Sequence, residues 1–194
     1  STMTNLPLLS IILFTPLVGF LVQSAVGRRL PRQGDLMTIA CIGTSLVCAL
    51  MIFARTLGGE VLDPAIAASG ARWEWLRMGT AVWTVGVKID GLTAVMLVVV
   101  TLVAFLVHVF SVGYMKGDPK YGKFFQWLQM FSVSMLTLVL ADNILTLFIG
   151  WELVGLCSYK LIGFWSEKKA PGNAARKAFI TTRIGDLGMV AGIM

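Results

Sequence analysis

The 194-residue chain is unusually apolar, because 57% of its residues are hydrophobic and only 13% are charged. A soluble domain usually carries about 25% charged residues, so the composition excludes a water-soluble globule. The net charge of +6 comes from basic residues in short segments beside apolar runs, where it favours an orientation signal over nucleic-acid binding. We therefore expect a multi-pass membrane protein that contacts the lipid bilayer and no nucleic acid.

Six apolar runs have about the 20 residues that a helix needs to cross a bilayer. They predict transmembrane helices over residues 6–26, 36–54, 91–115, 124–141, 144–165 and 174–194. The connections are too short for a separate soluble domain, so we expect an all-α polytopic membrane protein with a single membrane domain over residues 1–194. The last run reaches Met194 without a cap or an interfacial aromatic residue, which predicts the truncated N-terminal part of a longer subunit.

Two connections carry further structural signals. Residues 72–75 and 82–89, between the second and third runs, have the strand-like alternation that predicts a short hairpin on the membrane surface. Before the sixth run, Pro171 and Gly172 are helix breakers and Asn173 is a possible N-cap. We therefore expect the last helix to begin just after Asn173.

The basic residues predict the orientation, because Lys and Arg accumulate on the cytoplasmic side of a membrane. The connections after the first, third and fifth spans are basic, whereas those after the second and fourth are balanced or acidic. The basic residues are Arg28, Arg29 and Arg32, then Lys116, Lys120 and Lys123, then Lys168, Lys169, Arg176 and Lys177. We expect these three connections in the cytoplasm, and the N-terminus and the hairpin outside.

Five ionisable residues lie inside the predicted spans: His108, Glu152, Lys160, Arg183 and Asp186. Each costs at least about 2.5 kcal/mol near the membrane centre and so requires a partner or a function. At about 1.5 Å per residue, Glu152 and Asp186 lie roughly 20 Å, and Arg183 roughly 15 Å, from the inner ends of their helices. Arg183 and Asp186 share a helix face, so these three side chains can form one buried proton relay. Alternatively, Arg183 and Asp186 only neutralise each other and fix helix packing.

The other candidates have simpler alternatives. Lys160 lies about 8 Å from the inner end of its span, where its stem can snorkel to the interface. His108 could pass protons near neutral pH, although a lone histidine more often serves packing. Cys41, Cys48 and Cys157 lie in apolar runs without a CxxC pair, which predicts structural thiols and no metal site. Nucleotide-binding and haem motifs are also absent from the sequence, so we expect no catalytic residue and no cofactor in this chain.

Several motifs together resemble a known family. They are DGL at 90–92, GYM at 113–115, LADN at 140–143, GWELVGLCSY at 150–159, ARKAF at 175–179 and TRIGD at 182–186. In this order they are similar to the antiporter-like subunit L of NADH-quinone oxidoreductase, respiratory complex I. The resemblance covers essentially the whole chain, as the N-terminal third of such a subunit. It implies a proton-channel role for Glu152, with Arg183 and Asp186 as family-matching charges, whereas Lys160 departs from the family pattern.

The resemblance implies a proton-translocating subunit that couples electron transfer in other subunits to proton pumping. Its partners would be other membrane subunits of complex I, which would hold NADH, flavin, iron–sulfur clusters and quinone. The alternative is a cation/proton antiporter subunit, or an ion-coupled subunit of a related carbon-uptake, hydrogenase or photosynthetic complex. Leu153 is often Gly in respiratory members and Leu in photosynthetic ones, so the electron donor stays open. We expect the bacterial inner membrane, with an organellar energy-transducing membrane as the alternative.

Overall fold

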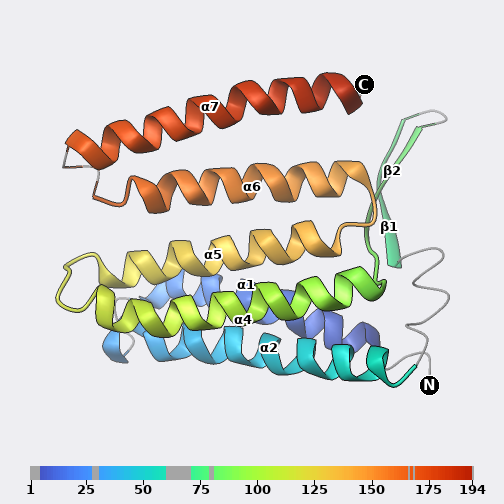
Figure 1. The fold of residues 1–194 in the computed structure, drawn as a ribbon, viewed down its shortest axis with the longest axis horizontal. Coiled ribbons are helices and arrows are strands. Elements are labelled where there is room, and N and C mark those ends of the chain that lie inside the picture. Colours follow the sequence, from blue (N-terminus) through green and yellow to red (C-terminus); the bar gives the residue numbers. More distant parts are fainter. Residues whose placement is uncertain are drawn as a thin grey trace.

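The computed structural model describes residues 5–27, 31–59, 71–78, 81–165, 167 and 169–193. Within these residues it contains six α-helices, a short 3-10 helix and one hairpin (Figure 1). They are α1 (Asn5–Val26), η2 (Pro31–Gly34), α2 (Asp35–Leu57), β1 (Ala71–Met78), β2 (Ala81–Val87), α4 (Gly91–Tyr114), α5 (Tyr121–Leu140), α6 (Ile144–Ile162) and α7 (Lys169–Ile193). The prediction of a polytopic helical protein with a short hairpin between its second and third long helices is confirmed.

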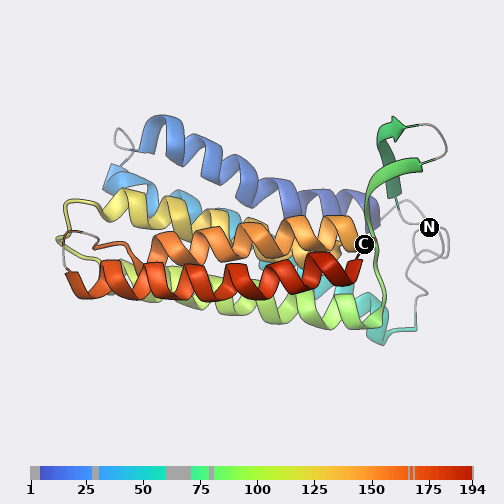
Figure 2. The same cartoon turned by 90° about the horizontal axis from the view of Figure 1, so that it is seen from above.

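The helices lie side by side along the long axis of the molecule (Figures 1 and 2). α2 packs against α1 and α4, α5 packs against α1, α4 and α6, and α7 packs against α6. The apolar core lies among α1, α2, α4 and α5, where Ile12, Ile52, Leu97 and Leu136 are fully buried. The pair formed by α6 and α7 therefore extends from one side of a compact four-helix core.

Five of the described helices, α1, α2, α4, α5 and α6, are long and apolar enough to span a bilayer. α7 has 25 residues but carries Arg176, Lys177, Arg183 and Asp186, so it is the least apolar of the long helices. Its charged residues explain why it is not among the five, because each charge lowers the hydropathy of the run. The sixth predicted span is thus present as a helix beside α6, and its charges belong to the candidate site below.

The predicted start of the last helix at residue 174 is wrong, because α7 begins at Lys169. Pro171 and Gly172 lie in its first turn, where a proline is tolerated because the missing N–H would have no intrahelical acceptor. The Asn173 side chain does not cap the helix but accepts a hydrogen bond from Arg176 Nη2 at 3.1 Å. The other helix boundaries lie within a few residues of the predicted ones, α5 beginning earlier than residue 124 and α6 ending before residue 165.

The three basic connections lie at one end of the helix bundle and the hairpin lies at the other (Figure 1). Arg28, Arg29 and Lys168 fall outside the described residues. The shared end agrees with the charge pattern, and the side of the membrane that it faces stays a prediction.

The hairpin is tied to the turn that starts α6. Lys88 N–H donates to the Leu140 carbonyl at 2.9 Å, and Asn143 Nδ2 donates to the Thr84 carbonyl at 2.9 Å. Asn143 Oδ1 also accepts from the Thr146 N–H at 2.8 Å, which caps α6. These contacts fix the start, and hence the register, of the helix that carries Glu152.

Pro16 lies inside α1 and leaves a backbone acceptor without its usual donor. A proline has no N–H, so the carbonyl of Ile12, four residues earlier, loses its helical partner. Ser45 of α2 donates its hydroxyl to that carbonyl at 3.0 Å. Because an unpaired carbonyl is costly inside a membrane, this contact accounts for a buried serine in an apolar helix.

Candidate functional site

The middle of the interface between α6 and α7 holds an ion pair. Arg183 Nη1 of α7 pairs with Glu152 Oε2 of α6, and Arg183 Nη2 lies 3.5 Å from the Glu152 carbonyl oxygen. Glu152 stands near the centre of α6. The predicted contact between the charges of these two helices is therefore confirmed.

Asp186 lies on the other side of the same guanidinium. Arg183 Nε is 3.7 Å from Asp186 Oδ2, and Trp151 Nε1 donates a hydrogen bond to Asp186 Oδ1 at 2.9 Å. Asp186 is one of the buried polar residues, with 8% of its surface exposed. We call Glu152, Arg183 and Asp186, with Trp151, the charged cluster.

Small and aromatic neighbours shape the space around Arg183. A Cβ atom at Gly155 would lie 3.0 Å from Arg183 Nη2, so the glycine makes room for the guanidinium. The Phe179 ring lies one turn earlier on α7, with its centroid 4.7 Å from Arg183 Cζ. This cation–π contact stabilises the cation on the face that its carboxylate partners leave uncovered.

The charged cluster contains one cation and two carboxyl groups. A single guanidinium balances one carboxylate, so the second carboxyl group is in excess and can bind a proton without leaving an uncompensated charge. The side chains of Glu152 and Arg183 are 25% and 31% exposed, whereas that of Asp186 is 11% exposed. Of the two carboxyl groups on this cation, that of Glu152 is therefore the less enclosed.

Lys160 does not join the charged cluster. It lies eight residues after Glu152 on α6, which corresponds to about 12 Å along a helix. Its Nζ stands 5.7 Å from the Trp127 ring centroid and 5.6 Å from that of Tyr159. With Lys123 and Arg176 it lines a cavity of about 420 Å³ at the end of the bundle that carries the basic connections. This position agrees with the interpretation of Lys160 as a snorkelling residue.

His108 also lies away from the charged cluster, because it is buried between α4 and α5. Its Nδ1 is 2.7 Å from the Ala104 carbonyl and its Nε2 is 3.0 Å from Gln129 Oε1. Gln129 in turn donates from Nε2 to the Pro16 carbonyl of α1 at 3.2 Å. The structure thus separates the predicted site residues into the charged cluster, a histidine network and a surface lysine.

Trp151 and Gln129 were not predicted as site residues, because the prediction rested on the ionisable residues in the spans. Gln129 is nonetheless a polar amide within an apolar run, and this feature is visible in the sequence. Nothing in the sequence indicates that Trp151 bonds to a residue on another helix.

Cys41, Cys48 and Cys157 are free, and Cys157 Sγ lies 3.8 Å from Ser134 Oγ. Their role as structural thiols stays a prediction. Across the described ranges, no three His, Cys, Asp or Glu side chains are grouped closely enough to hold a metal ion.

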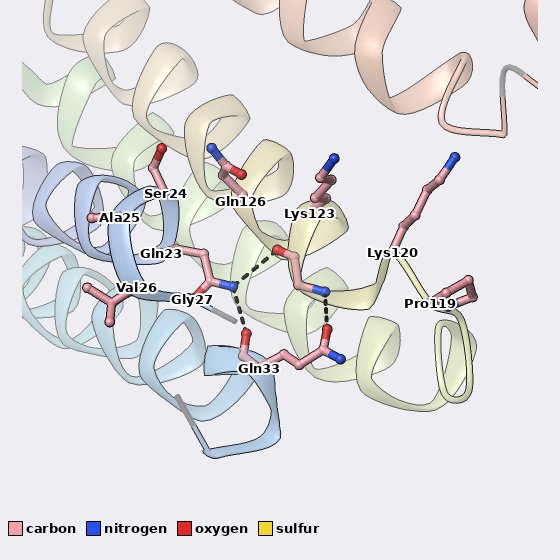
Figure 3. Close-up of a pocket in the computed structure, with 11 residues that line it drawn as sticks. Gln23, Ser24, Ala25, Val26, Gly27, Gln33, Pro119, Lys120, Lys123 and Gln126 are labelled. Atoms are coloured by element: carbon pink, nitrogen blue, oxygen red, sulfur yellow. Dashed lines mark hydrogen bonds between the residues drawn. The ribbon is translucent and has the colours of Figure 1, made fainter. Parts of the chain in front are cut away.

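An open cavity of about 890 Å³ lies where α1 ends and α5 begins (Figure 3). Its lining is polar and includes Gln23, Gln126 and Lys123. Gln23 Nε2 donates to the carbonyls of Gln33 and Gly122 at 2.7 and 3.1 Å, and the Gly122 N–H donates to Gln33 Oε1 at 2.9 Å. This cavity brings polar groups to the end of the α1–α5 interface in which Gln129 is buried.

The fold is shared with a solved respiratory complex. A chain in the structure of the membrane-bound sulfane sulfur reductase, described as an archaeal respiratory membrane complex, aligns with a TM-score of 0.73. The alignment covers 95% of this chain and 36% of that chain, at 14% sequence identity. At this identity the match concerns the fold alone.

Two family models match the chain. Residues 75–125 match "NADH-Ubiquinone oxidoreductase (complex I), chain 5 N-terminus", and residues 141–194 match "NADH:quinone oxidoreductase/Mrp antiporter, TM". The second match contains the whole charged cluster.

Curated relatives match nearly the full length of this chain. NADH-quinone oxidoreductase subunit L of Pseudomonas aeruginosa is 43% identical over 192 residues, 96% of this chain and 30% of the relative. The F(420)H(2) dehydrogenase subunit L of Methanosarcina mazei is 42% identical over 92% of this chain and 25% of the relative. NAD(P)H-quinone oxidoreductase chain 5 of Synechocystis is 38% identical over 91% of this chain and 25% of the relative. The chain thus spans between 25% and 30% of the length of these relatives.

The long apolar helices and the charged cluster between two of them define a multi-pass membrane subunit of the antiporter-like class. The family models and the relatives narrow this class. The chain belongs to the subunit L, or chain 5, family of NADH-quinone oxidoreductases.

Proposed function

We propose that this chain is the proton-translocating part of a membrane subunit of NADH-quinone oxidoreductase, in which electron transfer in other subunits drives proton movement. The observation that carries the proposal is the ion pair between Glu152 and Arg183 in the middle of the α6–α7 interface, with Asp186 as a second carboxyl group on the same cation. Ionisable groups in the middle of a membrane-spanning helix are costly, and in membrane proteins such groups commonly form ion pathways. Family membership supports the same role.

The cluster moves a proton by changing the partner of Arg183. When Glu152 takes up a proton, its carboxyl group becomes neutral and Arg183 keeps Asp186 as its anionic partner. When Glu152 releases the proton, the carboxylate pairs with Arg183 again. In the deprotonated state Arg183 lies between two carboxylates and the cluster carries one net negative charge, which proton uptake by Glu152 removes. The Trp151 hydrogen bond holds Asp186 in reach of Arg183 in both states.

The redox chemistry belongs, in this proposal, to the partner subunits. NADH, flavin, iron–sulfur clusters and quinone would be held there, and other membrane subunits of the complex would complete the proton path.

A second candidate keeps the fold but changes the driving reaction. The description of the family model over residues 141–194 also includes Mrp antiporters, which favours a cation/proton antiporter subunit as the alternative. A subunit of a related carbon-uptake, hydrogenase or photosynthetic complex is a further form of it. The two candidates differ in whether proton movement follows electron transfer or a cation gradient.

The test is Glu152→Gln in the assembled complex, because glutamine keeps the shape of the side chain and cannot titrate. We expect proton pumping per electron transferred to fall at least about tenfold while the complex still assembles, as for loss of a positioned proton-transfer group. Glu167→Gln is the matched control, since Glu167 is an exposed carboxylate that pairs with Lys120. Unchanged pumping in Glu152→Gln at the parent rate of electron transfer would refute the proposal, and pumping that follows a sodium gradient would favour the antiporter.

A further inference from the structure

His108 belongs to a chain of three hydrogen bonds that joins α4, α5 and α1. The chain runs from the Ala104 carbonyl to His108 Nδ1, from His108 Nε2 to Gln129 Oε1, and from Gln129 Nε2 to the Pro16 carbonyl, over 2.7, 3.0 and 3.2 Å. His108 and Gln129 are both fully buried. Both ring nitrogens of His108 are therefore hydrogen-bonded to other groups of the protein.

Both ends of this chain are backbone carbonyls, which can only accept a hydrogen bond. Nδ1 must therefore carry a proton to bond Ala104, and Gln129 Nε2 must donate to Pro16. The middle contact then joins His108 Nε2 to the amide oxygen of Gln129, which also only accepts. All three hydrogen bonds exist together only when both ring nitrogens of His108 carry a proton.

Turning the Gln129 amide does not remove this requirement. If Nε2 of the amide pointed to His108, the amide oxygen would face the Pro16 carbonyl, and two acceptors would meet without a proton. If the ring kept its single proton on Nε2, the bare Nδ1 would face the Ala104 carbonyl. A neutral His108 therefore loses one of the three hydrogen bonds in every arrangement.

The packing of α1 fixes Gln129 in this chain. A Cβ atom at Gly19 would lie only 2.9 Å from Gln129 Nε2 and 3.0 Å from Cys41 Sγ. Gly19 lies three residues after Pro16 on the same face of α1, so it leaves the space that the Gln129 amide fills. The hydrogen bond from Gln129 to the Pro16 carbonyl therefore requires a residue without a side chain at position 19.

The groups around His108 are neutral in charge or already paired. Its described contacts are the Ala104 carbonyl, Gln129 and the Phe125 ring, whose centroid is 6.2 Å away. The titratable groups at this end of the helices packed around His108 are the Cys41 thiol and Asp35 on α2, Tyr121 and Lys123 on α5, and Tyr114 on α4, of which Lys123 lines the open cavity at the end of α1. The Tyr121 ring packs against the Phe125 ring, and the Tyr121 hydroxyl donates a hydrogen bond to Asp35, which pairs with Arg32. Acceptor oxygens, and not a counter-charge, thus solvate a ring proton here.

We propose that His108 is a second proton-binding site, separate from the charged cluster, in which the proton completes the link between α4, α5 and α1. Loss of the proton breaks either the Gln129–Pro16 contact between α5 and α1 or the contact of the ring with its own helix. Gln126, which lies one turn from Gln129 on α5, lines the open cavity at the end of α1, and this points to that end of the bundle as the side of proton exchange (Figure 3). The site exchanges its proton with the end of the bundle that bears the basic connections.

The test uses ¹⁵N NMR of the imidazole ring in this chain in liposomes, because His108 is the single histidine of the sequence and gives its only imidazole signals. We expect two ring protons at the acid end of a titration between about pH 5 and pH 9, and one at the alkaline end. The Gln129 side-chain amide signal should change with the same midpoint.

Two variants at Gln129 give the sign of the effect. Gln129→Leu removes the acceptor of the second ring proton, so the midpoint should fall by about one pH unit or more, the size of one charge-assisted hydrogen bond. Gln129→Glu supplies a stronger acceptor and should raise it by a similar amount. Gly19→Ala should displace the amide and shift the midpoint in the direction of Gln129→Leu. Ser132→Ala is the control, because Ser132 Oγ bonds only the Leu128 carbonyl of its own helix.

A single ring proton on His108 across the whole pH range would overturn the proposal. Equal midpoints in the parent, Gln129→Leu and Gln129→Glu would overturn it as well. Glu152→Gln should leave this titration unchanged, so failure of the histidine site and failure of the proposed function are distinguishable.

Discussion

The four-helix core and the α6–α7 pair bury polar groups in opposite ways. In the middle of the core, buried hydroxyl and amide groups bond neutral partners: Ser45 bonds the Ile12 carbonyl, Thr101 bonds the Leu97 carbonyl and Gln129 bonds the Pro16 carbonyl. In the pair, the interface is held by charges, and among the described residues of α7 only Ala175 and Asp186 are buried. A neutral polar group can be fully enclosed once it is hydrogen-bonded, whereas a charge needs both a counter-charge and some access to solvent.

This difference assigns different roles to the two regions. The core is fixed mostly by neutral hydrogen bonds, and its titratable groups, such as the buried Asp35, the α4 cap Asp90 and His108, lie toward the ends of its helices or within the His108–Gln129 contact. The pair contains a carboxyl group in excess over its cation and changes its pairing when a proton arrives. Substitutions in the pair should therefore affect proton movement and stability together, and those in the core mainly stability.

Loss of the cation should give the largest effect. Arg183→Gln leaves Glu152 and Asp186 facing each other without a counter-charge, and we expect it to lower the free energy of unfolding by about 3 kcal/mol. Adding Glu152→Gln to Arg183→Gln should recover part of this loss, because the uncompensated carboxylate is removed. Reversible unfolding in lipid measures both. An Arg183→Gln variant as stable as the parent would show that the charges are not coupled.

The close approach of α5 and α6 should be the next most sensitive feature. A Cβ atom at Gly150 would lie 2.9 Å from the Leu138 backbone nitrogen, so Gly150→Ala must push the two helices apart at a cost of about 1–3 kcal/mol. Gly185→Ala on α7 is the control, because a Cβ atom there meets nothing within 4 Å. Thermal unfolding of the two variants tests the difference. Equal melting temperatures would mean that the helix contact is not the constraint.

Replacing Ser45, whose hydroxyl bonds the Ile12 carbonyl that Pro16 leaves without a donor, should give a smaller effect. Ser45→Ala leaves the Ile12 carbonyl without a donor, and we expect a loss of about 1 kcal/mol in unfolding free energy. Thr44→Val is the control, since the Thr44 hydroxyl bonds the Ala40 carbonyl of its own helix. A Ser45→Ala variant no less stable than Thr44→Val would remove backbone pairing as the reason for this serine.

Loss of the Asp90 cap of α4 should give the smallest change in the free energy of unfolding. Among these four stability effects, it is the one expected to depend on pH in the acid range. The Thr93 N–H donates to Asp90 Oδ1 at 2.8 Å and, together with the Thr93 hydroxyl and Lys88, lowers the pKa of Asp90 against the opposing effect of burial. Because the pKa is lowered on folding, this stabilisation is present above the ordinary aspartate pKa and is lost as the pH falls through the lowered value.

Asp90→Ala should therefore cost about 1 kcal/mol at neutral pH. Asp90→Asn should cost less and should remove the acid dependence of this contribution, because asparagine keeps the acceptor without titrating. The ordinary pKa of an aspartate is about 4. The free energy of unfolding, measured at neutral pH and below pH 4, therefore distinguishes Asp90→Ala from Asp90→Asn. If the difference in unfolding free energy between the parent and Asp90→Asn were the same at both pH values, the role of Asp90 would be contradicted.

The sequence predicts the helices and the charged cluster because both depend on simple regularities. Long apolar runs define the spans, and the i, i+3 spacing of Arg183 and Asp186 with the depth of Glu152 brings the three together. The hairpin follows from alternation. By contrast, the start of α7 at Lys169 was not predictable from Pro171 and Gly172, because a proline ends a helix in its interior and starts one in its first turn.

The contacts between distant segments could not be predicted from single residues. The pairing of Ser45 with Ile12 follows from Pro16 only after α1 and α2 are known to be neighbours. The bond from Trp151 to Asp186 and the His108–Gln129 contact depend on helix rotation, which periodicity alone does not fix for spans that are apolar on all sides. The charges were predictable because the membrane makes them costly, whereas neutral polar groups gave a weaker signal.

The most direct measurement of the central claim is infrared difference spectroscopy of the assembled complex during electron transfer, which follows protonation of carboxyl groups. The account predicts a carboxyl protonation signal in the parent and in Glu167→Gln that disappears in Glu152→Gln, together with proton pumping. The same signal in Glu152→Gln, with pumping at the parent level, would contradict the assignment of the translocated proton to Glu152.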